Sequence, residues 1–272
     1  MQPKPKHLET AYAEQFKDES VVQAYHYRPP YPDELFPCLV ELVKGEPKTV
    51  LDAGCGLGNI ARPLTNYVDH VTAVDFSEQM IAQGKQLPGG DASNLHWICA
   101  PIEAAPLTPP YGLITAGQSL HWFDWPVALP RFAKLLVPGG FLAIINRIFR
   151  QTAWDTELMQ LIARFSTNRD YQSYNLYDEL GKRQLFSKQG EKMIGPQSFT
   201  QTIDDYIEAI HSRNGFSRDR MRPEKAQAFD EAARELVWSY ASVERFETAV
   251  STHIVWGFPQ NGLPYKTNQV LS

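Results

Sequence analysis

Residues 49–75 have the sequence TVLDAGCGLGNIARPLTNYVDHVTAVD, and this stretch decides the fold. A short apolar run ends in Asp52, three glycines follow at alternate positions, and a second apolar run ends in Asp75. We expect a helix between the glycines and the second run. A nucleotide-binding βαβ unit has this layout: a strand, a glycine turn, a helix, and a second strand that ends in an acid. We therefore expect the rest of the chain to complete this sheet or to close a pocket over it.

The composition is that of a soluble globular protein. The chain has 272 residues, of which 43% are hydrophobic and 21% charged, which suits one large domain or a domain with a cap. The net charge is −5 and Lys and Arg form no basic block, so no nucleic-acid partner is expected. The N-terminus lacks the apolar core of a signal peptide, and no run is long enough to predict a membrane span. Cys38, Cys55 and Cys99 lie far apart, which argues against disulfides or a metal site and favours the cytoplasm.

Alternating strand and helix patterns predict a mostly parallel sheet that is covered on both faces. In such sheets ligands bind beyond the carboxyl ends of the strands. The glycine turn, Asp75, residues 100–103 and residues 118–122 all lie at such ends. Beyond the first two strands, we expect strands at residues 95–99, 113–116, 141–145, 199–203 and 248–256.

The pattern changes after the fifth strand, where helices and polar loops replace the regular alternation. Tyr and Phe residues in this later part suit an apolar or aromatic acceptor, and equally suit plain packing. Near the N-terminus, residues 25–32 contain three prolines and form either a surface linker or a pocket wall. We expect an N-terminal arm or lid at residues 1–32, a cofactor-binding core at 33–150, a helical cap insertion at 151–200, a C-terminal completion of the sheet at 201–260 and a loose tail at 261–272.

The two strand-end acids argue against a phosphate-bearing nucleotide. A carboxylate at Asp52 would repel a pyrophosphate and attract a ligand that carries an ammonium or sulfonium charge. No Lys or Arg lies in residues 52–60, and the glycines are spaced G-x-G-x-G rather than G-x-G-x-x-G. Asp75 is placed to accept both ribose hydroxyls. A ribose, an adenine and a positive charge without phosphates describe S-adenosylmethionine.

The chain resembles the class I S-adenosylmethionine-dependent methyltransferases, of the small-molecule group that includes trans-aconitate methyltransferase. The resemblance covers residues 25–145 well and is thin from Arg150 onward. It implies an α/β, Rossmann-like, mostly parallel seven-stranded sheet with helices on both faces and a helical cap insertion. It also implies S-adenosylmethionine as the cofactor and a small-molecule acceptor as the partner. The segments that carry it are residues 50–58, 74–80, 102–103, 119–124 and 136–140.

The resemblance also assigns residues to the cofactor. Relatives often have an acid just before the Ile102–Glu103 pair, where this chain has Ala100-Pro101, so Glu103 or a backbone carbonyl is expected to replace it. The implied contacts are Gly54, Gly56 and Gly58 with the methionyl part, Arg28 with its carboxylate, Asp75 with the ribose, Phe76, Met80 and Ile102 with the adenine, and Gln118 and Ser119 below the sulfonium.

Methyl transfer from a sulfonium is an in-line displacement that needs a general base only for some acceptors, and a carboxylate acceptor needs none. His121 is the first candidate base, and its alternative role is to hold the loop in place. His26 and Tyr27 are second candidates. Trp122 could face the sulfonium or be simply buried. Arg147 could bind an anionic acceptor, although we expect it at the surface.

Two other functions stay open on sequence alone. One is an NAD-dependent oxidoreductase on a similar sheet, and the other is a protein that binds S-adenosylmethionine without catalysis. The chemical nature of the acceptor does not follow from the sequence, and both a monomer and a homodimer are compatible with it.

Overall fold

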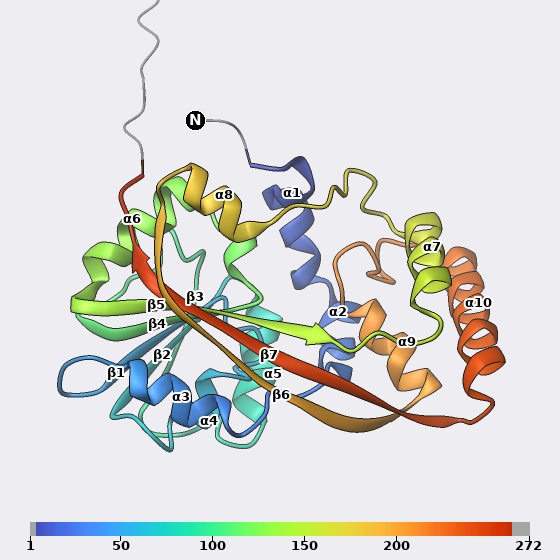
Figure 1. Cartoon of the computed structure of the whole chain (residues 1–272), viewed down its shortest axis with the longest axis horizontal. Coiled ribbons are helices and arrows are strands. Elements are labelled where there is room, and N and C mark those ends of the chain that lie inside the picture. The colour runs from blue at the N-terminus through green and yellow to red at the C-terminus, as the bar shows by residue number, and fades with distance from the viewer. Residues whose placement is uncertain (1–3, 263–272) are drawn as a thin grey trace, which may run out of the picture.

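The computed structural model describes residues 4–262, and these form one seven-stranded sheet with the order β3-β2-β1-β4-β5-β7-β6 (Figure 1). Neighbouring strands from β3 to β5 run parallel, whereas β7 is antiparallel to both β5 and β6. The predicted mostly parallel seven-stranded fold is thus confirmed. The strands are β1 Thr49–Ala53, β2 His70–Asp75, β3 Leu95–Cys99, β4 Tyr111–Gly117, β5 Leu136–Phe149, β6 Phe186–Thr202 and β7 Arg245–Pro259.

The helices between the parallel strands begin close to where their sequence signals predict. Ser77 is the N-cap of the helix after β2, and its hydroxyl accepts a hydrogen bond from the amide of Met80 at 3.3 Å. Asp124 precedes its helix as expected but makes no side-chain cap. These elements are α3 Leu35–Leu42, α4 Ala61–Leu64, α5 Glu78–Gln86, the 3-10 helix η4 Leu120–Trp122 and α6 Trp125–Leu135.

The central strands contribute to two hydrophobic cores, one on each face of the sheet. Val50 packs with α3 and α4, whereas Leu51 packs with α6 on the opposite face. Successive side chains of a strand point to opposite faces. Both side chains are fully buried. This double coverage explains why β1 is apolar at successive positions instead of alternating with polar residues.

The N-terminal arm is a chain of short helices that lies between the sheet and the C-terminal helices (Figure 1). Tyr12 donates its hydroxyl hydrogen to Asp170 at 2.6 Å, and Asp18 pairs with Arg220 at 2.6 Å. The arm is therefore tied to segments far away in the sequence. Its elements are η1 Lys6–Leu8, α1 Thr10–Ala13, η2 Glu14–Lys17, α2 Glu19–Ala24 and η3 Tyr25–Tyr27.

A second group of helices forms what we call the helical lobe, defined as α7 Asp155–Phe165, α9 Ile203–His211 and α10 Pro223–Ala241. A separate hydrophobic cluster centred on Phe229 joins all three helices. The expected cap at residues 151–200 differs from this arrangement, because β6 already occupies Phe186–Thr202 and α8 (Leu176–Lys182) packs on the sheet core instead. We therefore propose that the functional cap comprises α7, α9 and α10. Of the predicted tail, residues 263–272 lie outside the described residues.

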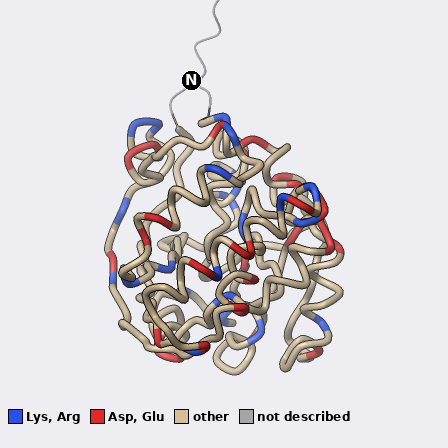
Figure 2. The backbone as a smooth tube through the Cα atoms, turned by 90° about the vertical axis from the view of Figure 1, so that its right-hand side faces the viewer, with Lys and Arg blue, Asp and Glu red and all other residues tan. Residues whose placement is uncertain are grey.

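Strands β6 and β7 are long and connect the sheet to the helical lobe (Figure 1). Their pairing runs from Phe186 opposite Pro259 to Thr202 opposite Arg245, with two register shifts. Figure 2 shows Lys and Arg interspersed with Asp and Glu along the backbone of the described residues. None of the described helices is long and apolar enough to cross a bilayer.

Candidate active site

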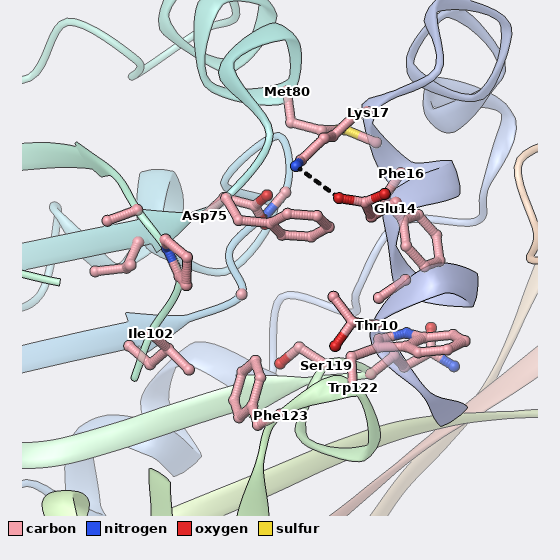
Figure 3. Close-up of a pocket in the computed structure, with 18 of the residues that line it drawn as sticks. Thr10, Glu14, Phe16, Lys17, Asp75, Met80, Ile102, Ser119, Trp122 and Phe123 are labelled. Atoms are coloured by element: carbon pink, nitrogen blue, oxygen red, sulfur yellow. Dashed lines mark hydrogen bonds and ion pairs between the residues drawn. The ribbon is translucent and has the colours of Figure 1, made fainter. Parts of the chain in front are cut away.

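A cavity of about 340 Å³ lies beyond the carboxyl ends of the parallel strands, between the sheet and the N-terminal arm. Figure 3 shows Asp75 and Met80 facing Glu14 and Phe16 of the arm across this cavity. We call it the donor pocket. Its position agrees with the expectation that ligands bind at the carboxyl edge of an open α/β sheet.

The glycine turn after β1 forms the floor of the donor pocket. Gly54 has φ +68°, and its amide and that of Cys55 both donate to the carbonyl of Val74, at 2.8 and 2.9 Å. A Cβ atom on Gly54 would lie 2.5 Å from the Cβ of Ser119. The sequence therefore needs glycine here both for the left-handed backbone and for the close approach of the loop after β4.

Asp75 ends β2 beside the glycine turn and lines the donor pocket. One carboxylate oxygen accepts the amide of Gly56 at 2.8 Å, and the other accepts the amide of Ser77 at 2.9 Å. Burial raises the pKa of Asp75, and these backbone bonds counteract the rise. Each oxygen keeps a free lone pair. The side chain is thus fixed in place with acceptor capacity left for two hydroxyl groups of a ligand.

Asp52 lies behind the glycine turn and does not line the donor pocket. Its oxygens accept the hydroxyl of Thr115 at 2.8 Å and the amide of Ala61, at the start of α4, at 3.2 Å. Burial raises the pKa of Asp52 to about 7. These bonds give Asp52 a structural role in joining β1 to β4 and α4, while a contact between Asp52 and the cofactor stays a prediction.

Ten of the predicted cofactor residues line the donor pocket together. Gly58 is not among them, because it packs under the turn, where a Cβ atom would meet the ring of Trp97 at 2.5 Å. Asp52 is also outside. The ten are Arg28, Gly54, Gly56, Asp75, Phe76, Met80, Ile102, Glu103, Gln118 and Ser119.

Two candidates to replace the adenine-binding acid line the donor pocket: the side chain of Glu103 and the backbone of residues 100–101. Glu103 lines the donor pocket, but one of its carboxylate oxygens accepts the amide of Asp124 at 2.7 Å. Ala100 and Pro101 also line the pocket and offer only backbone carbonyls there. Both predicted substitutes are thus within the pocket wall.

The arm supplies pocket residues that the sequence did not reveal. Thr10, Glu14, Phe16 and Lys17 all line the donor pocket (Figure 3). The ammonium group of Lys17 lies 5.1 Å from the ring centre of Phe76 and 3.3 Å from a carboxylate oxygen of Glu14. No motif marks these residues, because their role depends on the arm folding back over β2.

A second cavity of about 330 Å³ adjoins the donor pocket and lies toward the helical lobe. We call it the acceptor pocket. It shares Phe16, Arg28, Gln118 and Trp122 with the donor pocket. Trp122 thus lines both cavities and also packs against the hydrophobic core. The remaining lining residues are His7, Leu8, His121, Asn168, Tyr171, Tyr174, Arg213 and Asn214.

The three predicted catalytic residues have different positions. His121 lines the acceptor pocket, where burial and the charges of Lys4 and Arg28 lower its pKa to about 3. Such a histidine is a weak base at neutral pH. His26 is exposed, its ring lies 4.0 Å from that of Tyr27, and neither residue lines either cavity. The structure therefore brings only His121 to the site.

Arg147 is not the surface residue that we expected. Only 9% of it is exposed, because its guanidinium lies on the ring of Tyr31 at 3.7 Å from the ring centre. Its Nη1 donates to the side-chain oxygen of Gln118 at 2.9 Å. Gln118 has φ 54°, a strained value for a residue other than glycine. Arg147 thus holds the residue that separates the donor and acceptor pockets.

Comparison with known proteins shows which family the sheet and the glycine turn resemble. Residues 50–140 match the family model of a methyltransferase domain. The matched residues carry a domain of the class I S-adenosylmethionine-dependent methyltransferase type. The matched segment runs from β1 through the glycine turn to β5 and includes most of the donor pocket. This family uses a methyl donor, in contrast to the alternative of an NAD-dependent oxidoreductase.

This chain aligns with curated relatives over about a third of its length. It is 38% identical over 96 residues to a malonyl-[acyl-carrier protein] O-methyltransferase of Enterobacter lignolyticus, covering 35% of this chain and 37% of that protein. It is 32% identical over 103 residues to a trans-aconitate 2-methyltransferase of Streptomyces avermitilis, covering 36% of this chain and 38% of the relative. The chain therefore spans little more than a third of the length of these curated relatives.

A solved structure matches most of this chain. It belongs to an Anaeromyxobacter dehalogenans protein described as a candidate type II methyltransferase, with a TM-score of 0.58 and 23% identity. The match covers 86% of this chain and 99% of that one. At this identity the likeness shows a shared fold.

Proposed function

We propose that this protein transfers a methyl group from S-adenosylmethionine to a small-molecule acceptor. The observation that carries the proposal is the fixed carboxylate of Asp75 beside the glycine turn, with free lone pairs toward the donor pocket. A cofactor with a ribose and no phosphate suits this site, because the neighbouring turn has no Lys or Arg in residues 52–60.

The residues of the donor pocket would hold the cofactor in parts. Asp75 accepts the ribose hydroxyls, Met80 and Ile102 cover the adenine, and the backbone of the glycine turn receives the methionyl part. When bound, S-adenosylmethionine supplies a methyl group that is already activated for in-line displacement. The chain therefore contributes alignment, and well-oriented groups gain about 7–11 kcal/mol from such positioning.

The acceptor would enter from the side of the helical lobe. The acceptor pocket meets the donor pocket at Gln118 and Trp122, so an acceptor there lies next to the reacting end of the cofactor. His121 lines this pocket with a pKa near 3, which supports a role in holding the loop rather than in removing a proton.

The binding half of the proposal is tested by titrating the purified protein with S-adenosylhomocysteine in a calorimeter. We expect Asp75→Ala to weaken binding by about 100-fold, since two charge-assisted hydrogen bonds are lost at about 1.5 kcal/mol or more each. Asp91→Asn is the control, because Asp91 is exposed and outside both pockets. Equal affinity of Asp75→Ala and the parent would refute this use of the donor pocket.

The catalytic half is tested separately with a panel of small molecules and mass spectrometry of methylated products. Turnover of any member supports the enzyme. Tight binding of S-adenosylhomocysteine without turnover across a broad panel would favour the alternative of a non-catalytic binding protein.

A further inference from the structure

The acceptor pocket combines positive charge with an absence of acids. Among the described residues that line it, Arg28 and Arg213 carry permanent charges, and none is Asp or Glu. The donor pocket differs, because Glu14, Asp75 and Glu103 all line it. The donor pocket thus mixes acids with Lys17 and Arg28, whereas the charged residues that line the acceptor pocket are all arginines.

The two arginines are not neutralised within the described part of the chain. Arg28 donates from Nε to the hydroxyl of Ser212 at 2.8 Å and from Nη2 to the carbonyl of the same residue, both neutral partners. Neither Arg28 nor Arg213 forms an ion pair with a described carboxylate. Asp155 acts electrostatically on Arg213, but its oxygens already accept the amide and hydroxyl of Thr152.

A third guanidinium reinforces this charge from behind Gln118. Arg147 is nine-tenths buried, and its Nε and Nη2 have no hydrogen-bond partner among the described residues. Burial lowers the pKa of Arg28, and the charges of Arg147 and Arg213 lower it further. Arg28 and Arg213 are half-buried, and a cluster of like charges that is partly withdrawn from water is costly unless an anion compensates it. The cluster is therefore a site that binding of an anion would stabilise.

The two histidines that line the acceptor pocket, His7 and His121, are weaker bases than an ordinary histidine. Burial is the main cause that lowers the pKa of His7 and, to about 3, that of His121. Burial raises the pKa of Tyr174. A hydroxyl or ammonium acceptor would need a base to lose its proton, whereas a carboxylate is already ionised at neutral pH.

We propose that the acceptor is a small carboxylic acid, bound as its carboxylate by Arg213 and methylated on a carboxylate oxygen, with Arg28, which lines both pockets, lying between this carboxylate and the methionyl carboxylate of the cofactor. This rests on the proposed methyltransferase function. The carboxylate oxygen forms a bond to the methyl carbon while the carbon–sulfur bond of the donor breaks and leaves its electron pair on sulfur. The products are a methyl ester and S-adenosylhomocysteine, and no proton moves.

The neutral walls of the pocket indicate the rest of the acceptor. Phe16, Trp122, Tyr171 and Tyr174 offer aromatic surface, and Asn168 and Asn214 offer amides. A carboxylic acid with an aromatic or unsaturated body suits these walls. The ester has lost the charge that the arginines bind, so the product is held less tightly than the substrate.

The test incubates the full-length protein with S-adenosylmethionine and a panel of aromatic and aliphatic mono- and dicarboxylic acids, each paired with its neutral amide. We expect methyl transfer to acids and not to their amides, with products that release methanol in alkali as esters do. Binding of S-adenosylhomocysteine is measured on the same preparation. Normal binding together with no ester from any acid, or with equal transfer to amides, would overturn the proposal. Absence of that binding would instead refute the proposed function.

Substitutions of Arg213 then test whether this residue binds the carboxylate of the acceptor. We expect Arg213→Met to raise KM for the acid at least tenfold, with kcat within about threefold and unchanged affinity for S-adenosylhomocysteine, and Arg213→Lys to recover part of the loss. Arg150→Met is the matched control, because Arg150 is exposed and outside both pockets. An unchanged KM in Arg213→Met, or an equal loss in Arg150→Met, would contradict the assignment of Arg213.

Discussion

Asp52 illustrates how one buried carboxylate can serve the fold more than the ligand. It joins β1 to Thr115 of β4 and to Ala61 at the start of α4. Its pKa of about 7 means that burial favours the protonated form in the folded protein, against an ordinary value of 3.8. The negative charge that we expected at this strand end is therefore only partly present at neutral pH.

This gives a prediction for stability against pH. A carboxyl whose pKa is raised by folding stabilises the protein fully below its unfolded pKa, and this contribution is lost as the pH rises through the folded pKa. Between pH 5 and pH 8 the parent should lose roughly 3 kcal/mol of unfolding free energy relative to Asp52→Asn, which does not titrate. Urea unfolding of both proteins at several pH values measures the difference. A difference that is constant with pH would show that Asp52 is ionised throughout.

Gly54 gives a second prediction at the scale of one residue. Gly54 and Gly139 both have positive φ, at 68° and 77°, so alanine is strained equally at either position. A Cβ on Gly139 meets nothing within 4 Å, whereas one on Gly54 collides with Ser119. We expect Gly139→Ala to cost about 1 kcal/mol, and Gly54→Ala to cost about 3 kcal/mol.

The Gly54→Ala and Gly139→Ala variants also distinguish the effect of backbone strain from the loss of cofactor binding. Gly54→Ala should also abolish calorimetric binding of S-adenosylhomocysteine, because the turn shifts away from the donor pocket, while Gly139→Ala should bind normally. Equal stability and equal binding in the two variants would mean that the loop after β4 moves aside at no cost.

At the scale of elements, the N-terminal arm is the part whose position depends most on its neighbours. Its short helices are held by contacts with distant segments, and η2 places Phe16 and Lys17 against the donor pocket. Lys17 is nevertheless exposed, so trypsin can reach it. Elements of this kind open locally more easily than the sheet does.

We expect S-adenosylhomocysteine to slow tryptic cleavage after Lys17 by about tenfold, because a ligand in the donor pocket adds contacts to the arm and favours its docked form. Limited proteolysis followed by mass spectrometry measures the rate. Asp75→Ala at the same ligand concentration is the control and should show no protection. Unchanged cleavage of the parent at saturating ligand would indicate that the arm does not respond to the cofactor.

The core elements could be predicted from the sequence because their signals are local. An apolar run, the glycine turn and the cap at Ser77 each fix their own segment, and all the predicted strands are found, although β5 and β6 start earlier than expected. The position of Asp75 in the donor pocket follows from the same local layout, although its role in binding the cofactor stays a prediction.

The arm and the acceptor pocket could not be predicted, since they depend on contacts between distant segments. Phe16 reaches the donor pocket only because the arm folds back, and Arg213 reaches the acceptor pocket only because β6 carries α9 toward it. The sequence alone predicts Arg147 at the surface, because its burial depends on the ring of Tyr31, which lies more than a hundred residues earlier in the chain.

At the scale of the whole molecule, the sheet and the helical lobe share two strands. Because β6 and β7 run through both parts, we expect them to unfold together rather than as separate domains. Phe229→Ala, at the fully buried centre of the lobe, should cost about 3–5 kcal/mol. Hydrogen exchange in β1 and β4, on the far side of the molecule, should speed up to the same extent as exchange in α10.

Phe132→Ala, at an equally buried position on α6, is the reciprocal variant and should accelerate exchange in α10 as much as in β4. Faster exchange confined to the part that carries the substitution would show instead that the lobe and the sheet unfold independently.

The pairing of Thr202 with Arg245 has a practical consequence for engineering. Residues 203–244 leave and re-enter the sheet at two adjacent points, and the amide of Ile203 donates to the carbonyl of Glu244 across that base at 3.0 Å. The segment carries Arg213 and Asn214 but none of the donor-pocket residues. It is therefore a cassette that can be exchanged to change the range of acceptors, provided that Ser212 and Arg220 are kept, because these two residues hold Arg28 and Asp18 of the arm in place.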